Sequence, residues 1–198
     1  MSFLQEIQQK RKSLQRSTTI VTTTTGERYV ESKNSTLPPI KLESNKYGFI
    51  VDTKPDTEPA CIIENLLYLG SQDAVSLENI NKFKFTHILS IGIEMPIIEN
   101  MNDNLHTKFL PCLDLPETDL FAGLMQDAFT YIKDAKVTNG IVLVHCNAGV
   151  SRSASVVIAY LIKHCQMKFD DAYAYVKGKR ACVQPNSGFL KQLKKFCE

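Results

Sequence analysis

A histidine, a cysteine and an arginine interrupt the aliphatic segment "VLVHCNAGVSRSASVV", residues 142–157. The aliphatic residues before His145 predict a buried strand, and those after Arg152 predict a buried helix. A loop that leads from a strand into a helix can direct its own N–H groups and the unpaired first N–H groups of the helix at one point. We therefore expect an anion to bind there, and Gly149 gives the backbone the freedom that such a loop needs. The predicted anion-binding residues are Asn147, Ala148, Gly149, Val150, Ser151 and Arg152.

Cys146 and Arg152 lie at the two ends of this loop. The field that binds an anion at the start of a helix also favours a cysteine in its thiolate form, which is the nucleophilic form. Arg152 can bind two phosphate oxygens in a bidentate fork, and the Ser153 hydroxyl can hydrogen-bond the sulfur and make it a better leaving group. A buried structural cysteine is the alternative, but it would leave the arginine among aliphatic residues without a partner.

Attack by a thiolate on phosphorus also requires an acid that protonates the departing oxygen. The segment "CLDLPETDL", residues 112–120, lies between a predicted strand and a predicted helix. We predict Asp114, in the loop itself, as this acid and keep Asp119 as the alternative, because Asp119 is placed where it could simply cap the helix. His145 is expected to orient the loop rather than transfer a proton, since a thiolate needs no base.

Strand-like and helix-like segments alternate over residues 60–198 and must position these side chains. The predicted strands are 66–70, 86–92, 106–112 and 141–146, and the predicted helices are 76–83, 119–136, a buried helix after residue 152, 170–179 and a last one from residue 187. This alternation predicts an α/β fold with a central mixed, partly parallel sheet flanked by helices. Residues 60–198 are the expected compact domain, and residues 1–59 are expected to be a partly ordered extension with a helix and a hairpin.

Composition excludes several classes of protein. The 23 basic and 21 acidic residues give a net charge of +2, which indicates no nucleic-acid surface. The 6 cysteines contain no C-x-x-C pair, which favours reduced thiols, and no apolar run approaches the ~18 residues of a membrane span. We expect a soluble cytoplasmic protein, with the nucleus as a further location, that has neither nucleic acid nor membrane as a partner.

The order His145-Cys146, five residues, Arg152-Ser153 resembles the signature of the cysteine-dependent protein phosphatases. The blocks "LYLGSQDA", "THILSIG", "LDLPET" and "QPNSGFLKQL" are similar to those of the dual-specificity branch, atypical subgroup, over residues 60–198. The resemblance implies a protein tyrosine phosphatase-like fold. It also implies hydrolysis of phosphotyrosine, phosphoserine and phosphothreonine with no metal and no cofactor.

The same resemblance implies roles for individual residues. Cys146 would form a phosphocysteine intermediate, Asp114 would protonate the leaving oxygen and then activate water, and Ser153 would assist breakdown of the intermediate. Asn186 would support the phosphate-binding loop from behind. Ser90 departs from the family pattern, because many relatives have asparagine there, and this departure puts the hydrogen bonding around the site in doubt.

Phosphorylated proteins are the implied partners, with mitogen-activated protein kinases or their upstream kinases as candidates. Lys10, Arg11 and Lys12 followed by Leu14 resemble the docking segments of such kinase partners, although a solvated basic face is the alternative. Two other functions stay open: a phosphatase of RNA 5′ phosphates or glucan, and a signalling scaffold with little activity. The loop residues 147–151 include no lysine, which disfavours inositide substrates.

Overall fold

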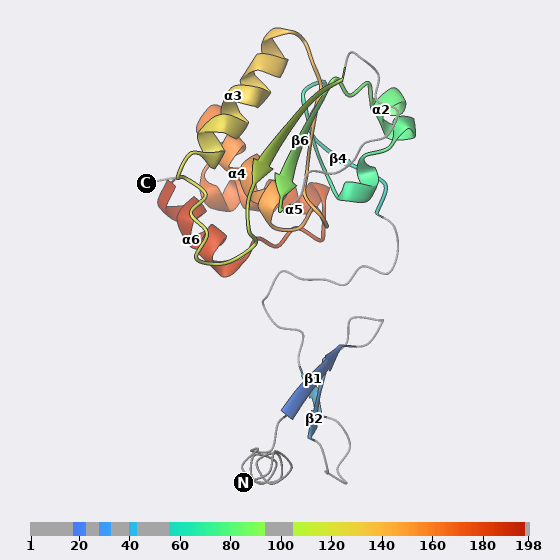
Figure 1. Cartoon of the computed structure of the whole chain (residues 1–198). Coiled ribbons are helices and arrows are strands. Elements are labelled where there is room, and N and C mark those ends of the chain that lie inside the picture. Colours follow the sequence, from blue (N-terminus) through green and yellow to red (C-terminus); the bar gives the residue numbers. More distant parts are fainter. Residues whose placement is uncertain (1–17, 23–27, 33–39, 43–55, 94–104, 197–198) are drawn as a thin grey trace, which may run out of the picture. The chain divides into compact units, whose positions relative to one another are not determined.

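The computed structural model describes residues 18–22, 28–32, 40–42, 56–93 and 105–196 (Figure 1). The chain divides into two units, residues 1–45 and 46–198. The first contains an antiparallel sheet of β1 (Thr18–Thr22), β2 (Arg28–Ser32) and β3 (Ile40–Leu42). The pairing of β1 with β2 corresponds to the expected hairpin, whereas β3 was not expected. The helix expected near the N-terminus and the basic segment 10–12 lie outside the described residues.

The division between the units falls before residue 59, where the sequence suggested a boundary. Residues 56–58 hydrogen-bond to residues of the second unit. The Ser71 hydroxyl donates to the carbonyl of Asp56 at 2.7 Å, and Lys82 Nζ lies 3.0 Å from Glu58 Oε1. These contacts place residues 56–58 with the second unit, which a polar, proline-containing sequence does not reveal.

A sheet with the strand order β4-β5-β8-β6-β7 forms the centre of the second unit. Its strands are β4 (Ala60–Ile63), β5 (Leu67–Gly70), β6 (His87–Gly92), β7 (His106–Pro111) and β8 (Val142–His145). Only β4 is antiparallel to its neighbour, so the prediction of a mixed, partly parallel sheet is confirmed. The edge strand β4 was not predicted, because it directly follows Pro59, where the sequence analysis placed the end of a proline-containing extension.

Helices cover both faces of this sheet (Figure 1). One face carries α3 (Leu124–Val137), α4 (Arg152–His164), α5 (Phe169–Lys179) and α6 (Ser187–Phe196), and the other carries η1 (Gln72–Ala74) and α2 (Leu77–Phe83). In β8, Val142 and Val144 belong to the larger core, whereas Leu143 belongs to the smaller cluster on the opposite face. Since successive side chains of a strand alternate between faces, covering both faces requires the uninterrupted aliphatic run.

Helix α4 is the central helix of the larger layer. Its residues 153–162 are all buried, as the sequence predicted, because α4 packs on the sheet and contacts α3, α5 and α6. Strand β8 lies in the middle of the sheet, and the loop of residues 146–151 joins β8 to α4 at the carboxyl ends of the parallel strands. In the described part of the chain, no helix combines the length and the apolar character needed to cross a membrane.

Helix α3 begins later than predicted. The sequence pattern predicts a start at Asp119, but the helix begins at Leu124. The Asp119 carboxylate accepts a hydrogen bond from Phe121 N–H at 2.8 Å, and Gly123 has a φ of 115°. The local turn and the left-handed glycine stop the helix from extending back to residue 119, which apolar periodicity alone cannot show.

Candidate active site

All five carbonyl groups of residues 147–151 accept hydrogen bonds from groups outside this loop. The donors are the N–H groups of Gln72, Gln184 and Ser155, the Ser155 hydroxyl and the Arg180 guanidinium, at 2.8–3.0 Å. Within the described residues, the N–H groups of residues 147–151 have no backbone acceptor. Because the carbonyls are held by the protein and buried N–H groups need partners, the loop can bind an anion through these donors.

Gly149 is required at its position for two reasons. Its φ of 65° lies in the left-handed region. In addition, a Cβ atom would lie 2.5 Å from the Gly70 carbonyl oxygen and 2.7 Å from Arg180 Nη2. Any other residue would therefore strain the backbone and push the loop away from the strand that supports it.

Cys146 and Arg152 line one pocket of about 270 Å³. The Ser153 hydroxyl donates a hydrogen bond to Cys146 Sγ at 3.1 Å. Cys146 is otherwise buried, with 4% of its surface exposed, so a molecule could reach the sulfur through this pocket. The other residues that line the pocket are Gln72, Ser90, Ile91, Gly92, Ile93, His145 and Asn147.

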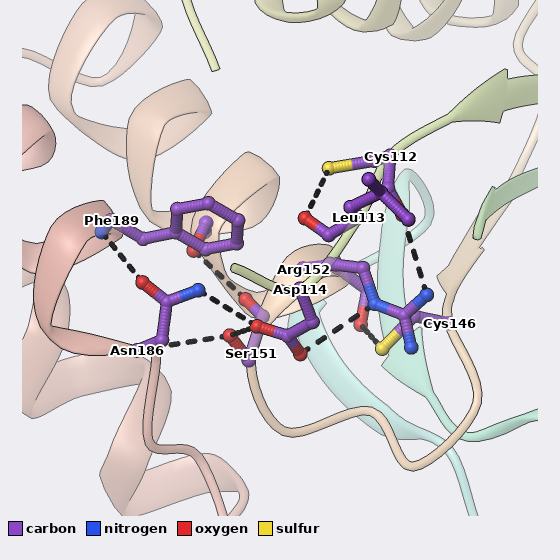
Figure 2. Close-up of polar contacts among 10 residues, drawn as sticks. Cys112, Leu113, Asp114, Cys146, Ser151, Arg152, Asn186 and Phe189 are labelled. Carbon is purple, nitrogen blue, oxygen red and sulfur yellow. Dashed lines mark hydrogen bonds and ion pairs between the residues drawn. The ribbon is translucent and has the colours of Figure 1, made fainter. Parts of the chain in front are cut away.

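The Arg152 guanidinium has an N–H group that makes no hydrogen bond with the described residues. Nη1 donates to the carbonyl of Cys112 at a long 3.5 Å, and Nε lies 3.6 Å from Asp114 Oδ2, which is too far for a hydrogen bond (Figure 2). Nε is therefore a buried donor without a hydrogen-bond partner among the described residues. Leaving a buried charged donor unpaired is costly, and a phosphate oxygen in the pocket would pair it.

Asp114 is the acidic residue that the structure brings to the loop. Its Oδ1 accepts hydrogen bonds from Ser151 Oγ at 2.7 Å and from Asn186 Nδ2 at 2.8 Å (Figure 2). Asp119 instead lines a different pocket, together with Phe121 and Phe196. The alternative acid is thus placed away from the nucleophile, and the Ser151 side chain, predicted to bind phosphate, faces Asp114.

His145 is buried behind the nucleophile and is held by Ser90. Burial lowers the pKa of His145 to about 4, so the ring is neutral at physiological pH. Nδ1 lies 3.4 Å from the Cys146 carbonyl, which can only accept, so Nδ1 carries the hydrogen. Nε2 then accepts from Ser90 Oγ at 2.7 Å. Ser90 thus supplies a hydrogen bond at the position where the sequence raised a doubt, and both ring nitrogens of His145 have partners.

The low pKa of His145 predicts an acid-sensitive fold. The unfolded chain protonates this ring below a pKa of ~6.5, whereas the folded protein resists protonation down to about 4. Stability contributed by the neutral ring is therefore complete above ~6.5 and is lost as the pH falls from ~6.5 towards 4. We expect the free energy of unfolding in urea to drop by about 2 kcal/mol from this group between about pH 7 and about pH 5. His145→Gln should flatten that slope, and an unchanged slope would contradict the assignment.

The sequence reasoning missed Arg180. This residue is 7% exposed; its Nε donates to the Gly149 carbonyl at 3.0 Å and its Nη2 donates to the Ala148 carbonyl at 2.9 Å. It also forms an ion pair with Asp56. In the sequence, Arg180 ends a run of lysines and glycine that is typical of a solvated helix end, and no local signal links it to a loop thirty residues earlier.

The sequence of this chain is similar to those of known proteins. Residues 67–198 match the family model described as the catalytic domain of dual specificity phosphatases. The mouse protein named dual specificity protein phosphatase 19 is 36% identical in an alignment of 193 residues that covers 94% of this chain and 85% of the mouse protein.

Solved structures of phosphatase-like proteins have a similar fold. The human tyrosine phosphatase-like serine/threonine/tyrosine-interacting protein is 34% identical, with a TM-score of 0.64 over 71% of this chain and 95% of that chain. The crystal structure of DUSP15 is 28% identical, with a TM-score of 0.64 over 70% of this chain and 86% of that chain.

Proposed function

Since the chain belongs to the dual specificity phosphatase family, we propose that it hydrolyses phosphotyrosine, phosphoserine and phosphothreonine in proteins through a phosphocysteine intermediate. The match to the family model and to the mouse relative confirms the family and the enzyme class that the sequence motifs indicated. The observation that carries the residue assignment is the pocket that Cys146, Asn147 and Arg152 line together, beside a loop whose N–H groups at residues 147–151 have no backbone acceptor among the described residues. The residue roles that follow are part of the proposal.

In the first step, the Cys146 thiolate attacks phosphorus. The sulfur–phosphorus bond forms while the bond between phosphorus and the side-chain oxygen of the substrate breaks. The loop N–H groups and Arg152 bind the phosphoryl oxygens and stabilise the charge that they carry in the transition state. Asp114 donates its proton to the departing oxygen, so that the product leaves as a neutral alcohol or phenol.

In the second step, the Asp114 carboxylate takes a proton from a water molecule that attacks phosphorus. The sulfur–phosphorus bond breaks, inorganic phosphate forms and the Cys146 sulfur leaves as a thiolate. The hydrogen bond from Ser153 Oγ stabilises the negative charge on the sulfur as it leaves. Neutral His145 orients the loop and takes no proton in either step.

Ser153→Ala should slow the second step more than the first. Loss of one hydrogen bond to a charged group costs about 1.5–3 kcal/mol, which is about 10- to 100-fold in rate. We therefore expect the variant to show a burst of phenol release on an activated aryl phosphate, followed by a slower steady state, in rapid-quench kinetics. A variant that turns over at the wild-type rate without a burst would show that Ser153 does not assist the breakdown of the intermediate.

A panel of phosphopeptides tests the substrate class. Three peptides of one sequence, which carry phosphotyrosine, phosphoserine or phosphothreonine at the same position, are incubated with the wild-type chain and with Asp114→Asn. We expect phosphate release from all three by the wild type and a slower release by the variant. Hydrolysis of a 5′-phosphorylated RNA or a phosphoglucan with none of the peptides would favour a non-protein substrate instead.

We propose further that the protein acts in mitogen-activated protein kinase signalling in the cytoplasm. Two features support this proposal. The chain belongs to the dual specificity phosphatase family, and its basic segment Lys10-Arg11-Lys12, followed by Leu14, has the composition of a kinase docking segment. A reducing compartment also keeps a nucleophilic cysteine in its active form. In a pull-down of purified kinases, replacing these three residues by alanine should weaken binding, and undiminished binding would reject the docking role.

A further inference from the structure

We propose that Ile93, Leu113 and Leu115 form an apolar rim beside the pocket, and that this rim contacts apolar side chains of a protein substrate near its phosphorylated residue. This inference rests on the proposed function, because it concerns the substrates of the same pocket. All three side chains of the rim are exposed: Ile93 to 67%, and Leu113 and Leu115 to 49% each. The rim favours phosphorylated segments that carry large apolar residues.

The ends of β6 and β7 hold the rim next to the pocket. These two strands are parallel neighbours, and Cys112 N–H donates to the Gly92 carbonyl at 2.7 Å where they end. Ile93 and Leu113 are the next residues along the two chain segments, so they lie beside each other. Ile93 also lines the pocket, together with Cys146. The rim therefore begins at the pocket itself.

Leu113 and Leu115 lie on either side of the proposed acid, Asp114. The Asp114 carboxyl group faces the pocket, because its Oδ2 lies 3.6 Å from Nε of Arg152, which lines the pocket (Figure 2). The acid passes its proton to the oxygen that joins the phosphoryl group to the substrate. The substrate chain attached to that oxygen must therefore lie close to the two leucines.

The rim contains half of the exposed large apolar side chains that the described residues have. There are six in all, and the three outside the rim are Leu77, Val137 and Tyr175. Single exposed apolar side chains are normal on a protein surface, whereas a group of them in one place marks a surface that a partner covers. Because this group adjoins the pocket that contains the nucleophile, the partner that covers it is the substrate.

The pocket has room for the phosphorylated side chain but not for the residues next to it. Its volume is about 270 Å³, which is below the ~300–1,000 Å³ of pockets that enclose a drug-sized ligand. The neighbouring residues of the substrate therefore lie on the surface around the pocket. Strand β8 lies between β5 and β6, so the exposed polar residues Gln72 and Asn147 line the side towards β5, and the rim lies on the side of β6 and β7.

Contact with the rim affects substrate binding rather than the chemical step. Removal of apolar surface from water is favourable and has no directional requirement, so several kinds of large apolar residue fit the rim. The contact is remote from the bonds that form and break, and it is equally strong in the bound substrate and in the transition state. Such uniform binding lowers KM and leaves kcat unchanged.

Two phosphotyrosine peptides test the preference of the wild-type chain. They differ only in the two residues before and the two residues after the phosphotyrosine, which are leucine in one peptide and serine in the other. We expect kcat/KM to be about 10-fold higher for the leucine peptide, through a lower KM, because partial burial of leucine side chains against the rim contributes about this factor. Equal values, or a preference for serine, would overturn the rim. Phosphate release from neither peptide would instead contradict the proposed function, on which the rim depends.

Ile93→Ser and Leu115→Ser test the rim itself. Each variant should reduce the preference for the leucine peptide from about 10-fold to about 3-fold or less, because each removes part of the apolar surface. The measured quantity is the ratio of kcat/KM for the two peptides, from which a general loss of activity or of folded protein cancels. A ratio that stays at the wild-type value in both variants would overturn the rim.

Val137→Ser is the matched control. Val137 is also an exposed apolar residue, at 75%, but it ends α3 and precedes the start of β8, so it lies at the opposite end of the sheet from the pocket. This variant should keep the wild-type ratio of kcat/KM for the two peptides. A fall of the ratio in Val137→Ser as large as in the rim variants would show that the preference does not come from the rim, and would overturn the proposal.

Discussion

Cys146→Ser should lower kcat by about 10⁴-fold or more on every phosphate monoester that the protein hydrolyses, which is the order of loss when an enzyme loses its nucleophile. A serine hydroxyl at this position is not ionised at neutral pH and needs a base. His145, the adjacent candidate, cannot act as that base, because it is buried and its Nε2 already accepts from Ser90 Oγ. Steady-state hydrolysis of an aryl phosphate measures the loss.

The matched control is Cys165→Ser. Cys165 is an exposed free cysteine at the far end of α4, so its replacement removes a thiol without touching the pocket, and activity should stay within about 2-fold of the wild type. Cys146→Ser should also keep its affinity for inorganic phosphate in calorimetry, because the anion donors remain. Turnover that persists in Cys146→Ser would rule out a phosphocysteine intermediate.

Arg152→Lys should lower kcat/KM by about 10²–10³-fold, although the charge is kept. Removing one preorganised donor from an oxyanion site costs about this much. Lysine has a single ammonium group that cannot bind two phosphoryl oxygens in a planar fork. The buried Nε, which has no hydrogen-bond partner among the described residues, is the donor that lysine lacks.

Two further variants separate the effect of the planar guanidinium geometry on kcat/KM from the effect of its positive charge. Arg152→Met, which removes both, should lose more than Arg152→Lys and should bind inorganic phosphate more weakly. Lys163→Met, at the other end of α4, removes an exposed positive charge and should leave kcat/KM unchanged at physiological salt. Arg152→Lys with wild-type kcat/KM would mean that only the charge at this position matters.

How far the sequence predicts the site depends on how local each feature is. Cys146, Gly149, Arg152 and Ser153 lie within eight residues on one strand–loop–helix connection, so their spacing alone implies an anion-binding loop with a thiol and a guanidinium. Side-chain periodicity likewise predicts the α/β fold, because alternating burial on a strand and a helical apolar face are properties of each element by itself.

The choice of acid could not be made from local features. Asp114 and Asp119 both lie in the connection between β7 and α3, and both are acidic residues near a predicted helix start. Strands β7 and β8 are parallel to the strand between them, so their carboxyl ends lie at the same edge of the sheet. This topology brings Asp114, which lies shortly after the end of β7, to the loop after β8, whereas Asp119 lies further along the connection and away from that loop.

The sequence by itself thus predicted the fold class from the periodicity of its elements, the family from the resemblance of its motifs, and the residues of the proposed phosphate-binding loop from their short-range spacing. The tertiary structure decided the partners of that loop: Arg180 behind its carbonyls, Ser90 on His145, and the hydrogen bonds from Ser151 and Asn186 to Asp114. These contacts join residues that are 31 to 72 positions apart. Nothing in the sequence near either partner marks such a contact, because it exists only where the packing of strands and helices places the two side chains side by side.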